Sequence, residues 1–191
     1  WRRDGRPLFG NGLFARAGGP FPLPGGSFVG APAVADIGGD GLSEVAIAEA
    51  NASGGVLHLY QTVPSPLDSL ARELIAQRVA RRPTTSPLIT DSLIAFGAAQ
   101  ATVYTMTVNG YRLDSIAIPG DTSDVVGLAA VNSTTGIVFT TAAGRIGTTL
   151  AFISPQAVGS GSPSLAAGSP VVGRLNERHP LVVVSALANG R

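Results

Sequence analysis

The sequence contains no cysteine and no lysine, and neither sign of charge dominates it. Without cysteine the chain has no disulfide, no thiolate metal ligand and no thiol nucleophile. The absence of cysteine does not decide between a reducing and an oxidising compartment. All 13 basic residues are arginine, 12 acidic residues oppose them, and the formal net charge is +1. Binding to a nucleic-acid backbone needs a concentrated positive field, so this balance argues against a nucleic-acid partner.

Long apolar runs are also missing, since no stretch approaches the ~20 residues that a membrane-spanning helix requires. We therefore expect no membrane span. The chain begins at Trp1 without an initiator methionine and ends at Arg191, just after a turn-like Asn189-Gly190. We expect such ends in a segment of a longer protein, whose export signal would lie upstream.

Turn-forming residues are abundant, with 25 glycines and 14 prolines in a chain whose apolar content is 45%. The apolar runs are short, rich in Val, Ile, Leu, Thr and aromatic residues, and bounded by Gly, Asn, Asp or Ser. Both features are typical of many short strands joined by turns. They predict an all-β protein.

One sequence pattern recurs along the chain. It consists of a small residue and proline, an apolar strand, a polar turn, a second apolar strand, then glycine and a third strand. Its spacing fits a unit of about 41 residues, the length of a four-stranded propeller blade. We therefore predict a single β-propeller-like array of antiparallel blades over residues 1–191. The expected units lie near residues 31–62, 86–118, 124–154 and 169–191. About three of them are complete, so chain outside this sequence would finish a closed ring.

An insertion at residues 65–82 interrupts this pattern and predicts the only helix of the chain. Ser65, Pro66 and Asp68 fit an N-cap, the first helical position and a capping box, and Pro83 would end the helix. The apolar residues at helical spacing are Leu67, Leu70, Leu74, Ile75 and Val79. The helix would either pack on the side of the propeller or dock a partner or a lipid surface.

The clearest motif is PAVADIGGDGLSEVAIAEA, from Pro32 to Ala50. It resembles the FG-GAP or VCBS-type repeat of integrin-alpha-type β-propellers, in which a strand led by a small residue and proline runs into ADxDGDGxxE and a second strand. The opening WRRDGRPLFG is similar to the usual end of a blade in that family, and the unit from Ser86 also resembles quinoprotein propeller repeats. The resemblance implies an exported, extracytoplasmic propeller used for adhesion, assembly or substrate positioning.

In that family the acidic loop commonly binds calcium, and the resemblance carries this site over only in part. The oxygen ligands would come from Asp36, Asp40, the carbonyl of Leu42 and Glu44. Gly38 occupies a position that usually supplies a side chain, so one ligand is missing and the affinity for calcium would be lower. The turns of the other units are poorer in acidic residues, so at most one calcium ion is expected. The same residues also fit a simpler role, because aspartates can cap a tight glycine-rich turn through backbone hydrogen bonds.

The other residues form no recognisable catalytic motif. The two histidines, His58 and His179, lie in different repeats, and no nucleophile accompanies either of them. His58 alternates with Leu57 and Leu59, so it belongs on the opposite face of its strand. The glycine- and serine-rich stretch at 159–162 is followed by no helix pattern, and the chain has no lysine for a Walker motif.

These observations predict a non-catalytic, extracytoplasmic interaction module that presents propeller loops to a protein or glycan partner, alone or within a larger surface assembly. Two alternatives stay open. The chain could be the accessory or partial propeller of a secreted enzyme, either a quinoprotein-like dehydrogenase or a hydrolase. It could also be a structural subunit of an extracellular filament, in which neighbouring chains complete exposed blade edges.

Overall fold

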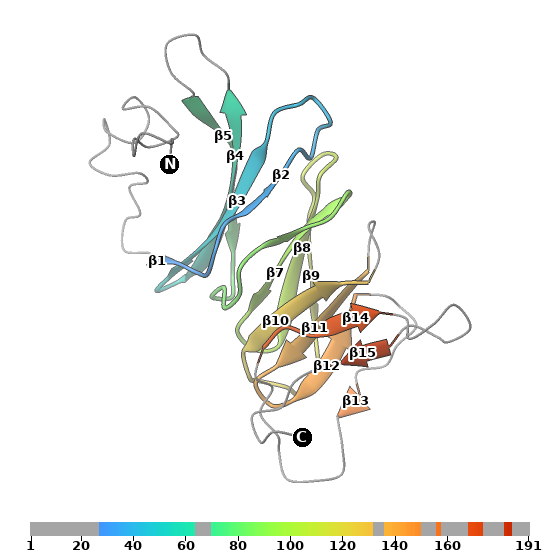
Figure 1. Ribbon diagram of the computed structural model, residues 1–191. Coiled ribbons are helices and arrows are strands. Elements are labelled where there is room, and N and C mark those ends of the chain that lie inside the picture. Colours follow the sequence, from blue (N-terminus) through green and yellow to red (C-terminus); the bar gives the residue numbers. More distant parts are fainter. Residues whose placement is uncertain are drawn as a thin grey trace, which may run out of the picture.

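The computed structural model describes residues 27–63, 70–131, 136–149, 156–157, 168–173 and 182–184. Within these ranges every regular element is a β-strand and there is no helix, so none that could cross a membrane. The strands form four sheets that follow one another along the chain, and all strand pairs are antiparallel (Figure 1). The prediction of an all-β, antiparallel fold is confirmed.

The first sheet contains five strands. Its outermost partners are β1 (Ser27–Phe28) and β2 (Ala33–Ala35), which both pair with β3 (Glu44–Asn51). The sheet then continues in chain order through β4 (Gly54–Val63) to β5 (Leu70–Val79). A tight turn joins β3 to β4, so these strands form a long regular hairpin.

The later sheets repeat this arrangement in shorter form. The second sheet consists, in chain order, of β6 (Leu88–Ile89), β7 (Leu93–Ala98), β8 (Thr102–Thr107) and β9 (Leu113–Ala117). The third consists of β10 (Val125–Ala130), β11 (Ile137–Thr141), β12 (Arg145–Thr148) and β13 (Gln156–Ala157). The described part of the fourth is the hairpin of β14 (Val171–Gly173) and β15 (Val182–Val184). Each sheet therefore uses strands that are adjacent in the sequence.

The helix predicted at residues 65–82 is wrong, because the described part of that segment contains strand β5. β5 pairs with β4 over most of its length. Helix propensity is a weak local preference, and here it is outweighed by pairing that satisfies the backbone groups along an edge of the ten-residue strand β4. Pro83, expected to end the helix, instead forms an isolated bridge with Ala98. The expected capping residues at 65–68 lie outside the described residues.

A β-bulge explains how the helix-like spacing of apolar residues fits a strand. The register of β5 against β4 shifts between Leu59 and Tyr60, which face Ile75 and Glu73 respectively. Leu74 is thus the extra residue of the bulge. Adjacent residues of a regular strand point to opposite faces, yet Leu74 and Ile75 both pack against the same core cluster.

The core lies between consecutive sheets. The cluster between the first and second sheets consists of Ala46, Leu57, Leu59, Val79, Ile94, Phe96, Ala98, Tyr104 and Met106. Within it the rings of Phe96 and Tyr104 stack with their centroids 5.3 Å apart. A second cluster contains Ala101, Val103, Ile118, Val125 and Phe139, from the second and third sheets. Both faces of the second sheet are therefore covered, because alternate residues of β8 belong to different clusters.

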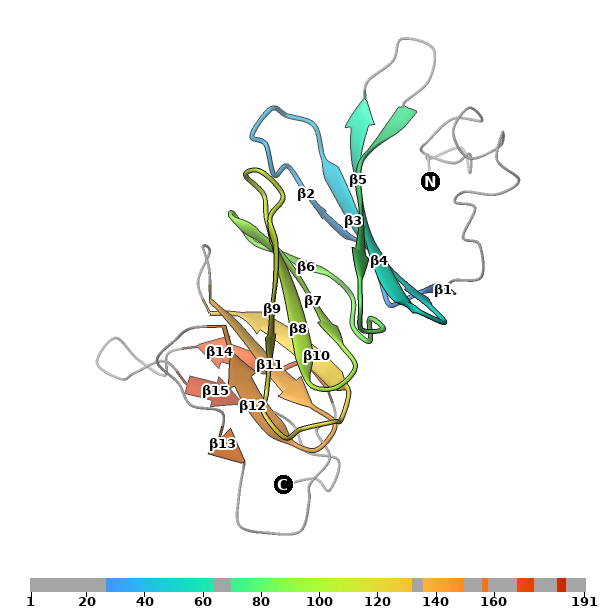
Figure 2. The ribbon, with the colours of Figure 1, turned by 180° about the vertical axis from the view of Figure 1, so that it is seen from behind.

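Strand β2 of the first sheet and the first strands of the later sheets lie next to one another. β2 contacts β6, β6 contacts β10, and β10 contacts β14. Figure 2 shows the same succession from behind, from the blue first sheet to the orange and red strands. Glycines permit the close approach, since a Cβ on Gly97 would overlap Val125 and one on Gly127 would overlap the backbone of Ser169. The sheets are thus stacked in chain order.

Asp121 holds the connection between the second and third sheets. Its side chain is 3% exposed. The carboxylate accepts hydrogen bonds from the backbone N–H and hydroxyl of Ser123, at 2.9 and 2.6 Å, and from the hydroxyl of Thr141 at 2.8 Å. Burial alone would raise the pKa of Asp121, but these hydrogen bonds and the nearby Arg145 guanidinium hold it below its ordinary value.

We expect Asp121→Asn to lower the free energy of unfolding by about 1–3 kcal/mol at neutral pH, because the amide cannot accept all the hydrogen bonds of the carboxylate. Since the folded pKa is depressed, the carboxylate stabilises the fold above the ordinary value of 3.8, and this contribution is lost as the pH falls through the folded pKa. Urea denaturation at neutral and acidic pH should show the two proteins converging in acid. A difference that is independent of pH, or equal to that of the exposed Asp91→Asn, would contradict this role.

Candidate functional site

The acidic loop predicted to bind calcium forms the turn between β2 and β3. The carboxylate of Asp36 accepts hydrogen bonds from the backbone N–H groups of Asp40 and Gly41, at 3.2 and 2.9 Å. One carboxylate oxygen of Asp40 accepts from the Leu42 N–H at 2.8 Å, and the other from the Gln61 side-chain amide at 2.9 Å. Each of the four aspartate oxygens therefore accepts a hydrogen bond from a donor within or beside the turn.

The turn also requires its glycines and uses the predicted glutamate. Gly39 and Gly41 have φ angles of 66° and 81°, which lie in the left-handed region that favours glycine. Glu44 is 3% exposed, and its carboxylate accepts a hydrogen bond from the Ile37 N–H at 2.7 Å. The structure thus brings Asp36, Asp40 and Glu44 into one turn whose contacts are those of carboxylate capping. Calcium binding stays a prediction.

A hollow of about 370 Å³ lies between this turn and the corresponding turn of the second sheet. Its lining residues are Ala35, Asp36, Ile37, Gly38, Gly39, Ile89, Thr90 and Asp91. The two turns meet here because β2 and β6, the strands that precede them, are neighbours. The hollow therefore combines carboxylates from equivalent positions of two sheets with small and apolar side chains.

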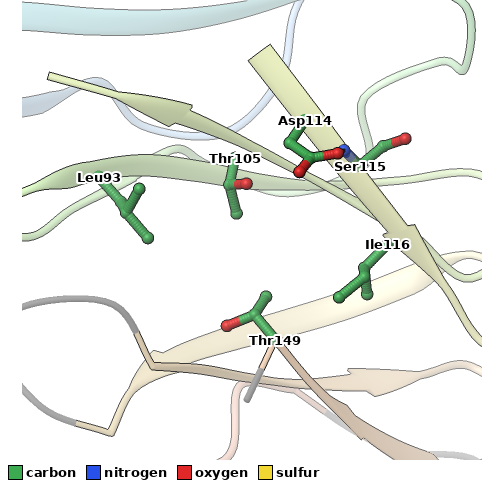
Figure 3. Close-up of a pocket in the computed structure, with 6 residues that line it drawn as sticks. All are labelled: Leu93, Thr105, Asp114, Ser115, Ile116 and Thr149. Atoms are coloured by element: carbon green, nitrogen blue, oxygen red, sulfur yellow. The ribbon is translucent and has the colours of Figure 1, made fainter. Parts of the chain in front are cut away.

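A smaller recess of about 170 Å³ lies between the second and third sheets (Figure 3). It is lined by Leu93, Thr105, Asp114, Ser115, Ile116 and Thr149. Thr149, which directly follows β12, faces residues of β7, β8 and β9 across the recess. No sequence motif marks this recess, because its residues come from separate repeats.

His58 belongs to a polar cluster on the side of the first sheet that faces away from the second sheet. Its Nε2 is 2.9 Å from a carboxylate oxygen of Glu49, and its Nδ1 is 2.9 Å from one of Glu73. The Tyr60 hydroxyl donates to the same Glu73 oxygen at 3.1 Å. Glu49 lies on β3, His58 and Tyr60 on β4, and Glu73 on β5. We call these four residues the polar cluster; it ties three strands together.

The polar cluster does not have the geometry of a metal centre. Its two carboxylates approach opposite nitrogens of one imidazole ring, so the three groups do not converge on a point as metal ligands must. Burial, together with the neighbouring Glu73 carboxylate, raises the pKa of the Tyr60 hydroxyl. This hydroxyl therefore stays protonated and serves as a hydrogen-bond donor to Glu73.

The remaining sequence candidates, His179 and the stretch at 159–162, lie outside the described residues. No family model matches the sequence, and no curated protein matches it significantly. The inference of function therefore depends on the motif, the stacking of the sheets and the geometry of the turns.

We expect Asp36→Ala to lower the free energy of unfolding by about 1 kcal/mol, because two backbone N–H groups lose their acceptor in an exposed turn. Asp91→Ala, in the corresponding turn of the second sheet, is the matched control. Urea denaturation of both variants without added metal measures the difference. Equal losses in the two variants would show that the capping contacts contribute nothing specific.

Proposed function

We propose that this chain is a run of β-propeller blades of the FG-GAP or VCBS type that acts as a non-catalytic interaction module outside the cytoplasm. The observation that carries the proposal is the succession of sheets. Each of the first three sheets contains four strands paired in chain order, and in the first sheet β1 pairs with β3 as a fifth strand. The first three sheets pack face to face, and β2, β6, β10 and β14 lie next to one another in succession. Such stacking is expected of blades arranged around an axis.

A stacked array holds the turns of successive sheets at fixed distances, which suits it to presenting a composite surface. The hollow between the β2–β3 and β6–β7 turns is the surface that we assign to a protein or glycan partner. Its carboxylates, Asp36 and Asp91, can accept hydrogen bonds from hydroxyl or amino groups of a ligand. Ile37 and Ile89 add apolar contact area on the walls of the hollow.

The test is binding of the purified chain to arrays of glycans and of extracellular proteins, followed by titration of the strongest ligand. Asp91→Ala should weaken binding at least about tenfold, since a hydrogen bond to a charged group contributes roughly 1.5–3 kcal/mol. Asp114→Ala, in the recess between the second and third sheets, should leave affinity unchanged. Absence of any ligand, or equal effects of the two substitutions, would contradict the assignment.

Calcium binding at the acidic turn belongs to the same proposal. A bound ion would raise the melting temperature of the chain, because it binds the folded state and not the unfolded one. The rise should be absent in the double variant Asp36→Ala, Asp40→Ala, whose remaining ligands are too few for calcium. Differential scanning calorimetry with millimolar calcium or with a chelator makes the comparison. No shift in the unsubstituted chain would exclude the site.

A further inference from the structure

Strand β9 forms one edge of the second sheet. Within the described residues it pairs with β8 on one side and with no strand on the other. Four of its five residues, from Asp114 to Ala117, are exposed, and the apolar side chain of Ile116 is among them. An edge of this kind offers a row of backbone N–H and C=O groups to which a strand of another chain can pair.

The hydrogen bonds between β8 and β9 show which backbone groups of β9 point outward. The Thr107 N–H donates to the Arg112 carbonyl at 3.0 Å, where the two strands meet their turn. Hydrogen-bonded and non-hydrogen-bonded pairs alternate along an antiparallel ladder. Two positions further along, Thr105 and Asp114 therefore form the next hydrogen-bonded pair. Ser115 follows Asp114 and belongs to a non-hydrogen-bonded pair, so its N–H points away from β8.

The carboxylate of Asp114 takes up this outward N–H. Its Oδ1 accepts a hydrogen bond from the Ser115 N–H at 2.7 Å (Figure 3). Each residue has only one backbone donor, and a hydrogen bond of this length engages it fully. A strand that pairs with β9 from outside would first have to displace the carboxylate. The middle of the exposed edge is therefore closed by a side chain of β9 itself.

We propose that Asp114 keeps the outer edge of β9 from pairing with a strand of another chain. Charged side chains on edge strands commonly prevent association between sheets. Here the side chain acts through the hydrogen bond that it accepts from the following residue. The proposal does not depend on the proposed function. It bears on the alternative of a filament subunit, because this edge would not be one that a neighbouring chain completes.

Asp114→Val tests the proposal, since valine favours extended backbone and has no acceptor for the Ser115 N–H. Analytical ultracentrifugation of the full chain over a range of concentrations measures self-association. The variant should associate at concentrations at least about tenfold lower than the unsubstituted chain, because the free N–H can then pair with a second copy. Asp114→Asn is the matched control. Its side-chain carbonyl can still accept the hydrogen bond, so it should behave as the unsubstituted chain does.

Amide hydrogen exchange measures the hydrogen bond of Ser115 directly. At concentrations too low for association, the Ser115 amide should exchange at least about threefold faster in Asp114→Val than in the unsubstituted chain. Its exchange in Asp114→Asn should be unchanged. Equal exchange of this amide in Asp114→Val and in the unsubstituted chain would overturn the proposal.

Ser115→Pro, added to Asp114→Val, separates pairing through this edge from unspecific contacts of the new valine. Proline has no N–H, and it is tolerated on an edge strand where the N–H would face outward. The double variant should therefore return to the behaviour of the unsubstituted chain. Association that persists in the double variant, or that is equal in Asp114→Val and Asp114→Asn, would contradict the role of Asp114. The same holds if Asp114→Val associates no more strongly than the unsubstituted chain.

Discussion

Replacing Phe96 by alanine is expected to lower the free energy of unfolding by about 3–5 kcal/mol. Phe96 is fully buried between the first and second sheets and stacks on Tyr104. Its removal deletes apolar surface from the core cluster that joins these sheets and leaves a cavity, because the surrounding close-packed residues relax only partly. Since typical domains are stable by only about 5–15 kcal/mol, this loss would take a large share of the total.

Phe28→Ala provides the matched control, because Phe28 lies on β1 and is 42% exposed. It should cost less than about 1 kcal/mol. Urea denaturation followed by circular dichroism measures both variants against the unsubstituted chain. Similar losses for Phe28→Ala and Phe96→Ala would show that the two sheets do not share a specifically packed core.

The features that could be predicted from the sequence are those that depend on short-range chemistry. Alternating apolar runs and turn residues specify strands locally, and the acidic turn is closed by residues within a few positions of one another, such as Asp36 and Gly41. The alternation in Val-Leu-His-Leu-Tyr also assigns His58 to the face opposite the leucines that fill the core.

The features that could not be predicted depend on pairing between distant residues. Residues 70–79 have helix-forming composition, and only the unpaired edge of β4 and the bulge at Leu74 make the strand the better solution. The error also concealed the polar cluster, because Glu73 reaches His58 only from a strand. The hollow at Asp36 and Asp91 was missed for the same reason, since it needs two sheets to be neighbours.

A close backbone contact between β10 and the segment that leads into β14 predicts the second large effect. Gly127 of β10 lies against the backbone of Ser169, where a Cβ would overlap the Ser169 Cα. Backbone atoms cannot move aside as flexible side chains can, so Gly127→Val should displace the fourth sheet. We expect it to lower the free energy of unfolding by about 3 kcal/mol, the upper part of the range for overpacking.

Gly173→Val, in β14, separates this clash from the effect of valine in a strand. Among the described residues, no atom lies within 4 Å of a Cβ at Gly173. The substitution should therefore be neutral or slightly stabilising, because valine favours extended backbone. Denaturation gives the two free energies, and hydrogen exchange in Gly127→Val should rise most in β14. If Gly127→Val were as stable as Gly173→Val, the fourth sheet would not be packed on β10, and the stack would end at the third.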